Sequence, residues 1–311
     1  MNKRLNLAKR IALGAGLALA GLTGLCYDSH KTANKPLNEA GTEYSSPSHL
    51  EEKLTPADKV FNEFPSEIPG AYSIEKKHQA NGSKYCLAHI LQRHLPPSES
   101  YPGVTSKNAP PEFRLAYFKE CQKANAVQKG IYNILNFLAE KNEVSEVRHE
   151  GSIKGMSQEE ADAFYRKMLG HILQNSLPSG EAIKQTLADK EMMERDFRYA
   201  PNGAILLAME GKIKILPAEK EETRKKTSEE YLATRQVSLA TQNQREDDLL
   251  ELASQSENPL QVLVYGGAHD WMDNIKAWNE RYPDRKFSYL VITPNAFKIL
   301  NAARTASEEN K

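Results

Sequence analysis

The sequence predicts an α/β fold with a largely parallel or mixed central sheet flanked by helices. Short apolar runs alternate along the chain with longer segments of helical periodicity, which is the pattern of strands joined by crossover helices. Two short runs, Tyr85–Leu91 and Leu260–Tyr265, are apolar except for one residue each, as strands buried on both faces are. A chain of 311 residues with 40% hydrophobic residues is long enough to bury such a sheet.

The start of the chain has the layout of an export signal. Residues 1–10 carry four basic residues and no acid, and an unbroken apolar stretch covers Ile11–Leu25. We expect a signal peptide or membrane anchor over residues 1–26. Two outcomes stay open, which are cleavage after Ala20 and lipidation of Cys26. Either one predicts an exported protein of the cell envelope, anchored to the membrane through its N-terminus or secreted.

The remaining chain divides into a tether, a domain and a tail. Residues 27–70 are rich in polar residues and predict a flexible tether with one short helix around 57–64. A single α/β domain is expected over residues 71–300, with a helical insertion at about 156–255 and a polar tail at 301–311. The insertion would either form a lid over the sheet or pack beside it.

The first half of the domain is predicted to contain two strands and three helices. The first strand is Tyr85–Leu91, and Pro110-Pro111-Glu112 opens a long helix with apolar residues at helical spacing up to Leu138. Val144–His149 is a second short strand. Ser157-Gln-Glu-Glu160 is a capping box that begins a helix, and a further helix is expected over Gly180–Arg195.

The second half begins with an expected hairpin, because residues 204–209 and 212–216 flank the pair Glu210-Gly211. A charged helical segment follows, with a second capping box at Thr227–Glu230, and continues to about Ser254. The strand Leu260–Tyr265 then leads into a glycine pair. A helix over 274–281 and a last strand over 287–292 complete the predicted domain.

Composition and missing motifs exclude several classes of function. Lys and Arg together number 41, as do Asp and Glu, so the sequence lacks the basic excess of a nucleic-acid binder. The sequence has no G-x-S-x-G, H-E-x-x-H, phosphate-loop or C-x-x-C motif. Cys86 and Cys121 could pair in an exported protein, but the apolar run around Cys86 favours two buried thiols.

Chemically capable side chains follow four predicted strands, at the point where each strand ends. They are His94, Glu150, Glu219 and His269. Ligand sites of open parallel sheets form beyond the carboxyl ends of the strands, so we expect these residues to converge. Two imidazoles and two carboxylates could run general acid–base hydrolysis, or His94, Glu150 and His269 could bind a divalent metal.

His269 is the strongest candidate in this set. The preceding Gly266 and Gly267 let the backbone approach a ligand closely, and no core-packing reason demands two glycines there. Asp270 could orient the imidazole. Arg245, on the charged helix before this strand, is a candidate clamp for an anion or carboxylate.

Each candidate also has a structural alternative. A single histidine after a strand is more often a hydrogen-bonded loop residue than a ligand, Glu219 could begin a helix, and Arg245 could be a surface arginine. His89 lies in the middle of a strand and is expected in the core. His149 and Glu150 should point to opposite faces, so at most one of them faces the site.

Taken together, these motifs resemble the superfamily of TraB/TIKI, ChaN-like and erythromycin-esterase-like proteins over residues 80–295. The resemblance is carried by Ile90-Leu-Gln-Arg-His94, Val147-Arg-His-Glu150-Gly151 and Gly266-Gly-Ala-His269. The run Gln128–Leu138 looks like the helix between the first two motifs, and Arg245-Glu246 like an arginine-bearing helix before the third. The first motif departs from the family's G-x-x-H form, because Leu91 stands in place of the glycine.

The resemblance implies the fold predicted above and one of several activities, namely metal-dependent proteolysis, His/Glu esterase chemistry or haem binding by a lipoprotein. Our leading hypothesis is an exported hydrolase of a small-molecule or peptide substrate. His94 and His269 would be acid–base groups or ligands of Mn, Zn, Co or Fe, and Glu150 a general base or ligand. One alternative is a haem-binding protein, in which His94 or His269 ligates the iron and Trp271, Tyr265 and Met272 pack the ring. The other is an inactive scaffold of the same fold.

Overall fold

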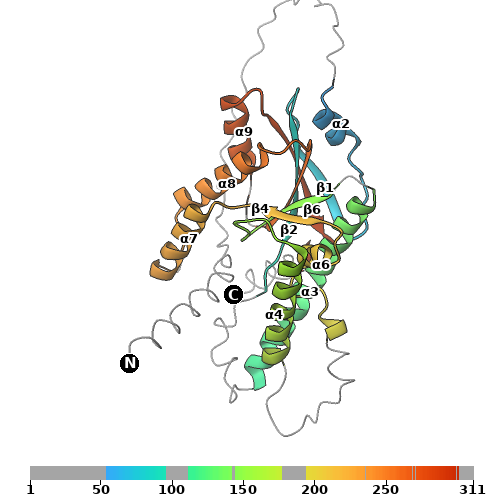
Figure 1. The fold of residues 1–311 in the computed structure, drawn as a ribbon, viewed down its shortest axis with the longest axis vertical. Helices are drawn as coiled ribbons and strands as arrows, with labels where there is room; N and C mark the ends of the chain where they lie inside the picture. Colours follow the sequence, from blue (N-terminus) through green and yellow to red (C-terminus); the bar gives the residue numbers. More distant parts are fainter. Residues whose placement is uncertain are drawn as a thin grey trace, which may run out of the picture.

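A computed structural model describes residues 54–95, 111–141, 144–176, 194–234, 236–267, 269, 271–298 and 300. Its centre is a six-stranded sheet in the order β1–β6–β2–β5–β3–β4 (Figure 1). The strands are β1 (Ala71–His78), β2 (Tyr85–Gln92), β3 (Glu146–His149), β4 (Lys214–Pro217), β5 (Leu260–Gly266) and β6 (Phe287–Pro294). Only β1 runs antiparallel to its neighbour, so the predicted α/β class with a largely parallel, mixed sheet is confirmed.

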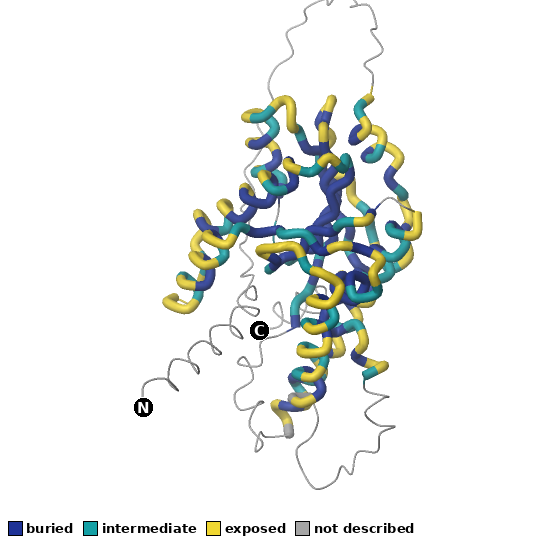
Figure 2. Tube along the Cα trace, viewed as in Figure 1, coloured by how far each residue is buried: buried dark blue, intermediate teal, exposed yellow. Residues whose placement is uncertain are grey.

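Helices cover both faces of this sheet, and the strands β2, β3, β5 and β6 are buried along most of their length (Figure 2). One face packs against α2 (Pro56–Glu63), α3 (Pro111–Glu140) and α6 (Gly203–Met209), with α4 (Gln158–Ser176) behind them. The other face packs against α8 (Leu239–Ala253) and α9 (Met272–Arg281), and α7 (Glu221–Thr234) packs on α8.

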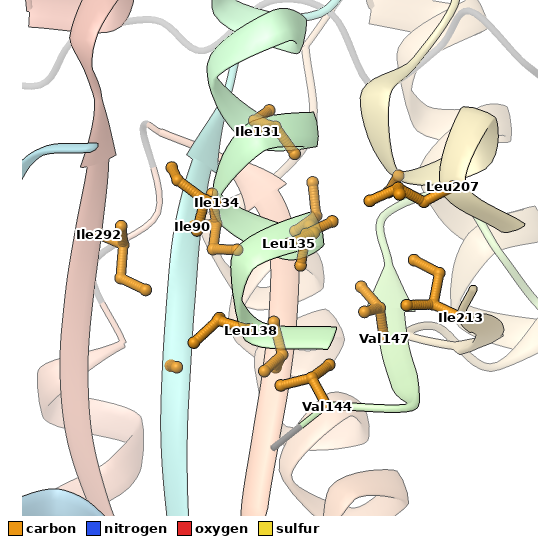
Figure 3. Packing of buried hydrophobic residues seen from close by; sticks show 14 of the residues in the cluster. Ile90, Ile131, Ile134, Leu135, Leu138, Val144, Val147, Leu207, Ile213 and Ile292 are labelled. Carbon is orange, nitrogen blue, oxygen red and sulfur yellow. The ribbon is translucent and has the colours of Figure 1, made fainter. Parts of the chain in front are cut away.

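The long helix α3 holds the strands of one face in place. Its buried residues Ile131, Ile134, Leu135 and Leu138 follow the i, i+3, i+4, i+7 spacing of a single helix face. This face lies against Ile90 of β2, Val147 of β3 and Ile292 of β6 (Figure 3). The helix contacts β1, β2 and β6, whereas β3 is held beside β2 through its pairing with β5. One helix therefore supports most of this face of the sheet.

Most predicted elements are present. The predicted strands at 85–91, 144–149, 260–265 and 287–292 appear as β2, β3, β5 and β6. The long helix begins at Pro111, and the capping box before α4 forms: Glu160 N donates to Ser157 Oγ at 3.2 Å, and Ser157 N to Glu160 Oε2 at 3.0 Å. The predicted helix over 274–281 is α9. Residues 177–193, which cover most of the helix expected at 180–195, lie outside the described residues.

The predicted hairpin is wrong. Residues 203–209 form helix α6, and only 214–217 form a strand, which pairs with β3. The Asn202 side chain begins the helix, because its Oδ1 accepts from the backbone N–H groups of Ala204 and Ile205. The run Ala204–Ala208 is buried throughout, and an apolar run buried on every side has no periodicity that separates helix from strand.

The predicted capping box at Thr227–Glu230 is also wrong, because these residues lie inside α7. There Thr227 Oγ1 donates to the carbonyl of Thr223, as hydroxyls inside helices commonly do. The next helix instead begins at Ser238, whose Oγ accepts from Thr241 N. The segment 156–255 was expected to be a helical insertion, but it contributes β4 to the sheet.

The folded body begins earlier than the expected start at Ala71. The short helix expected around 57–64 exists as α2, and Ala57 and Phe61 pack into the core of the sheet. The following strand β1 was not predicted. The signal or anchor segment 1–26, the tether up to residue 53 and the tail 301–311 lie outside the described residues.

Two further observations concern the described residues. None of their helices has the length and apolar character needed to cross a membrane. Cys86 and Cys121 are buried thiols rather than disulfide partners, and burial raises the pKa of the Cys86 thiol to about 12. The expectation of buried thiols is therefore confirmed.

Gly203 permits the close approach of α6 to α3, so we expect Gly203→Ala to destabilise the fold. A Cβ at this position would lie 2.2 Å from the carbonyl oxygen of Gln128 and 2.9 Å from the Tyr132 nitrogen. Such overpacking typically costs about 1–3 kcal/mol, measurable by urea unfolding. Gly170→Ala in α4 is the matched control, because no atom lies within 4 Å of its Cβ position. The control should be about 1 kcal/mol more stable than the wild type. Equal stability of Gly203→Ala and wild type would contradict the packing argument.

His89 should make the fold sensitive to acid. The imidazole is fully buried between Tyr289 Oη and the Tyr265 carbonyl, at 3.2 Å from each, and burial lowers its pKa to about 4. In the unfolded chain the His89 imidazole binds a proton below about pH 6.5, whereas in the folded chain it stays neutral down to about pH 4. The free energy of unfolding therefore keeps its full value above about pH 6.5 and declines toward pH 4, by up to about 1.4 kcal/mol per pH unit. Urea unfolding at pH 7 and pH 5 should show a smaller loss in His89→Gln than in wild type. Equal losses would refute this.

Candidate active site

The parallel strands bring the predicted residues to one edge of the sheet. Gln92 at the end of β2 pairs in register with Gly266 at the end of β5, and His149 of β3 pairs with Val264. The residues that follow these strand ends therefore meet. All four predicted residues lie at this edge: His94, Glu150, Glu219 and His269.

Glu150 is the centre of the site. Its Oε2 accepts hydrogen bonds from the backbone N–H of Gly266 at 2.7 Å and from Gln92 Nε2 at 3.1 Å. His94 Nε2 lies 2.7 Å from the same oxygen, and Arg245 Nη2 donates to Oε1 at 3.3 Å. A buried carboxylate surrounded by donors is an ionised acceptor, and these contacts hold Gln92, His94 and Arg245 around Glu150.

The charges of this cluster shift the pKa of both members of the His94–Glu150 pair. Burial alone would raise the pKa of Glu150, but the positive charges of His94, Arg245 and His269 hold it well below the ordinary 4.5. Burial alone would lower the pKa of His94, but the Glu150 carboxylate raises it above 6.5. The His94 side chain is 25% exposed and that of Glu150 only 4%, so a substrate can reach the imidazole and not the carboxylate.

Arg245 joins Glu150 to Glu219. Its Nη2 donates to Glu219 Oε1 at 2.6 Å, and the arginine is buried, so the alternative of a surface arginine is wrong. Glu219 Oε1 also accepts from Gly151 N at 3.1 Å, and Arg224 lies 3.4 Å from its other oxygen. Helix α7 begins at Glu221, so Glu219 precedes its first turn and belongs to the charged cluster.

A second pair of histidine and carboxylate lies beside the first. His269 Nδ1 is 2.7 Å from Oε1 of Glu246, which follows Arg245 on α8, and the His269 side chain is 15% exposed. The predicted orienting residue, Asp270, lies outside the described residues. The sequence did not predict that Glu246 pairs with His269, although Arg245-Glu246 is part of the family resemblance.

The two glycines after β5 have different reasons to be there. A Cβ at Gly266 would lie 3.3 Å from Glu150 Oε2 and 3.6 Å from His269 Cδ2, so a side chain would fill the space between the two pairs. A Cβ at Gly267 would lie 2.1 Å from Cζ of Phe297. The expectation that packing makes no demand on this glycine pair is therefore wrong for Gly267.

His149 and His89 behave as expected. His149 lies on the opposite face of β3 from Glu150, where Asn202 Nδ2 is 2.7 Å from its Nε2. Burial lowers its pKa to about 4, so the imidazole is neutral. His89 is likewise a buried core residue. The structure adds two residues that the sequence did not single out for catalysis, Gln92 beside Glu150 and Tyr265 beneath Arg245.

His94, Glu150 and His269 were also predicted to bind a divalent metal, which stays a prediction, and the present contacts of these residues compete with metal binding. Arg245 brings a fixed positive charge against both Glu150 and Glu219, and the Nε2 of His94 is already engaged by Glu150. Among the described residues, no three or more His, Cys, Asp or Glu side chains are grouped as metal ligands. Trp271 and Tyr265, predicted to pack a haem ring, are fully buried among other side chains.

This edge of the sheet thus holds two histidine–glutamate pairs and an arginine that links two carboxylates. The superfamily resemblance stays a prediction from the sequence motifs. Comparisons with protein-family models, with curated proteins and with solved structures found no match for this chain.

Proposed function

We propose that this protein is an exported hydrolase in which two histidine–glutamate pairs cleave an ester or amide bond by acid–base chemistry. The observation that carries the proposal is the pairing itself: His94 with Glu150 and His269 with Glu246, on either side of Gly266. Each imidazole is partly exposed and each carboxylate is shielded behind it. The sequence resemblance to erythromycin-esterase-like proteins supports the same reaction class.

His94 is the general base of this proposal. Its Nε2 faces Glu150, so its Nδ1 takes the proton from a water whose oxygen attacks the substrate carbonyl carbon. Glu150 keeps the ring in place and stabilises the imidazolium that forms, as a buried carboxylate does behind a catalytic histidine. The raised pKa of His94 makes it a stronger base than a free imidazole.

His269 is the general acid. Its Nδ1 faces Glu246, so its Nε2 donates a proton to the leaving oxygen or nitrogen as the carbon–heteroatom bond breaks. The attacking water thus supplies the new carbon–oxygen bond and one proton to His94, while the leaving group receives one proton from His269. Exchange with solvent returns both histidines to their starting states.

The charges at the site favour an uncharged reacting group. The two arginines, Arg245 and Arg224, already pair with carboxylates of the chain. Three carboxylates surround the two histidines, which disfavours an anionic substrate near the scissile bond. We therefore propose a neutral ester or amide of a small molecule or peptide. The predicted N-terminal signal or anchor would place this reaction in the cell envelope.

Haem binding and a scaffold role without turnover stay as alternative predictions, and so does metal-dependent hydrolysis. We favour the acid–base reaction over these three because every group it needs is supplied by the described residues. His94 and His269 each keep one ring nitrogen that makes no hydrogen bond to another described residue.

Removing either histidine should abolish most of the turnover. We expect His94→Ala and His269→Ala each to lower kcat/KM for p-nitrophenyl acetate at least about 100-fold, because general acid–base groups contribute roughly that factor or more. Circular dichroism would show that the variants fold. His78→Ala is the control, since His78 lies on β1 at the opposite side of the sheet and should leave kcat/KM unchanged. Folded variants with wild-type turnover would sink the proposal.

Replacing Glu150 should move the pH profile in a defined direction. The Glu150 charge raises the pKa of His94, so Glu150→Gln lowers that pKa, and more of His94 is in the basic form at acidic pH. The acidic limb of kcat/KM should therefore move to lower pH, while kcat on the plateau falls about tenfold or more. Glu75→Gln, which breaks an ion pair with Lys77 on the edge strand β1, should leave the limb in place. An unmoved limb in Glu150→Gln would exclude His94 as the base.

A further inference from the structure

Tyr265, at the end of β5, contacts charged and titratable groups from both halves of the site. The Arg245 guanidinium carbon lies 5.5 Å from the centre of its ring. The His269 ring meets it edge to face, with 4.8 Å between the ring centres and 85° between the planes. The hydroxyl donates to Glu219 Oε1 at 3.3 Å, and the side chain is fully buried.

We propose that Tyr265 is a positioning residue whose ring fixes Arg245 and His269 relative to each other and so couples the two histidine–glutamate pairs. This inference deepens the proposed function. The effect that we expect of Tyr265 substitutions on turnover rests on that function. Their effect on the charge around His94 follows from the arrangement of the side chains alone.

The ring is the acting part, because Arg245 is held by few hydrogen bonds. Only Nη2 of its guanidinium donates to the two carboxylates, and its buried Nε has no hydrogen-bond partner among the described residues. An aromatic face attracts a guanidinium most strongly where water is excluded. The ring of Tyr265 supplies such a face and limits the movement of a side chain that two glutamates would otherwise share.

The hydroxyl of Tyr265 contributes less. Its bond to Glu219 Oε1 is long, and the same oxygen accepts from Arg245 Nη2 at 2.6 Å and from Gly151 N at 3.1 Å. Removing the hydroxyl therefore leaves Glu219 with its stronger donors. This distinction between ring and hydroxyl allows two substitutions at one position to have opposite outcomes.

Tyr265 is itself held firmly. Trp271 packs edge to face against its ring at 5.3 Å between centres, and its backbone carbonyl lies 3.2 Å from His89 Nε2. Its strand is paired on one side with β2 and on the other with β3. Because Trp271 restrains the ring and the neighbouring strands restrain the backbone, Tyr265 can in turn restrain Arg245 and His269.

Loss of the ring has a measurable electrostatic consequence at His94. The groups that act on His94 are Glu150 after β3, Glu219 after β4, Arg245 of α8 and the neutral His149 of β3. The positive charge of Arg245 lowers the pKa of His94. If Arg245 moves away when the ring is lost, the carboxylates act on His94 unopposed and its pKa rises further.

The test uses the full chain with Tyr265→Leu, Tyr265→Phe and the matched control Phe287→Leu. Phe287 is a fully buried ring of the same core cluster, at the start of β6, where it packs against the rings of Tyr85 and Trp278. One readout is the NMR titration of the His94 Cε1 proton, which needs no substrate. The other is the pH profile of kcat and KM for p-nitrophenyl acetate.

In Tyr265→Leu we expect the His94 titration to move to higher pH and the acidic limb of kcat/KM to move with it. At the plateau kcat should fall about 30-fold, the factor that corresponds to a desolvated cation–π contact, with KM within twofold of wild type. Tyr265→Phe, which keeps the ring, should match the wild type within about twofold. Phe287→Leu should lower the melting temperature and leave the His94 titration in place.

Two results would overturn the inference. One is a folded Tyr265→Leu in which His94 titrates as in wild type, and the other is a Tyr265→Phe as impaired as Tyr265→Leu, which would assign the role to the hydroxyl. If the leucine variant does not fold, Tyr265→Met fills the space with a flexible side chain without a ring and is held to the same outcomes. If even the wild type fails to hydrolyse the ester, the proposed function loses its support, while the NMR titration still decides the role of Tyr265.

Discussion

The buried carboxylate of Glu150 is the constraint on which the arrangement of this sheet edge depends. A buried charge is costly unless it is paired and hydrogen-bonded, and leaving one unpaired typically costs about 3–5 kcal/mol. The donors to Glu150 come from the end of β2, the residues after it, the end of β5 and helix α8. One side chain therefore fixes the relative positions of three strands and a helix, since Glu150 itself follows β3.

The two faces of the sheet carry different kinds of residue. Toward α3 and α6 the sheet presents aliphatic residues such as Val147, Val264 and Ile90, which belong to one buried cluster with residues of these helices. Toward α8 it presents tyrosine, tryptophan and histidine at the carboxyl end of the strands. Such residues combine an apolar body with a polar tip, so they can be buried and still hold a charged group in place. The edge that carries the two histidine–glutamate pairs is thus supported by the apolar cluster on the α3 side. Two of its charged residues, Arg245 and Glu246, come from α8 on the other side.

Features of the fold and the site that depend on a local stretch of sequence could be predicted. Those that depend on contacts between residues far apart in the sequence could not. The buried strands β2 and β5 and the residues just after them were predictable, because parallel strands end at one edge and their apolar runs are unambiguous. Glu246 and Tyr265 were not assigned their roles, because these depend on how α8 packs against β5, which no local pattern records. Helix α6 was predicted as a strand for a related reason, since complete burial removes the periodicity that identifies a helix. The strand β1 escaped notice because its residues are largely exposed and polar.

Arg245 and Glu246 are consecutive residues of α8, yet they serve different histidines. Neighbouring side chains on a helix leave its axis in directions about 100° apart, so the dipeptide spans the gap between the two pairs only at one rotation of the helix. An insertion or deletion between Ser238 and Arg245 would rotate both residues away together. Any length variation in this region of the chain is therefore expected before the helix, in the turn that joins α7 to α8, and not within it.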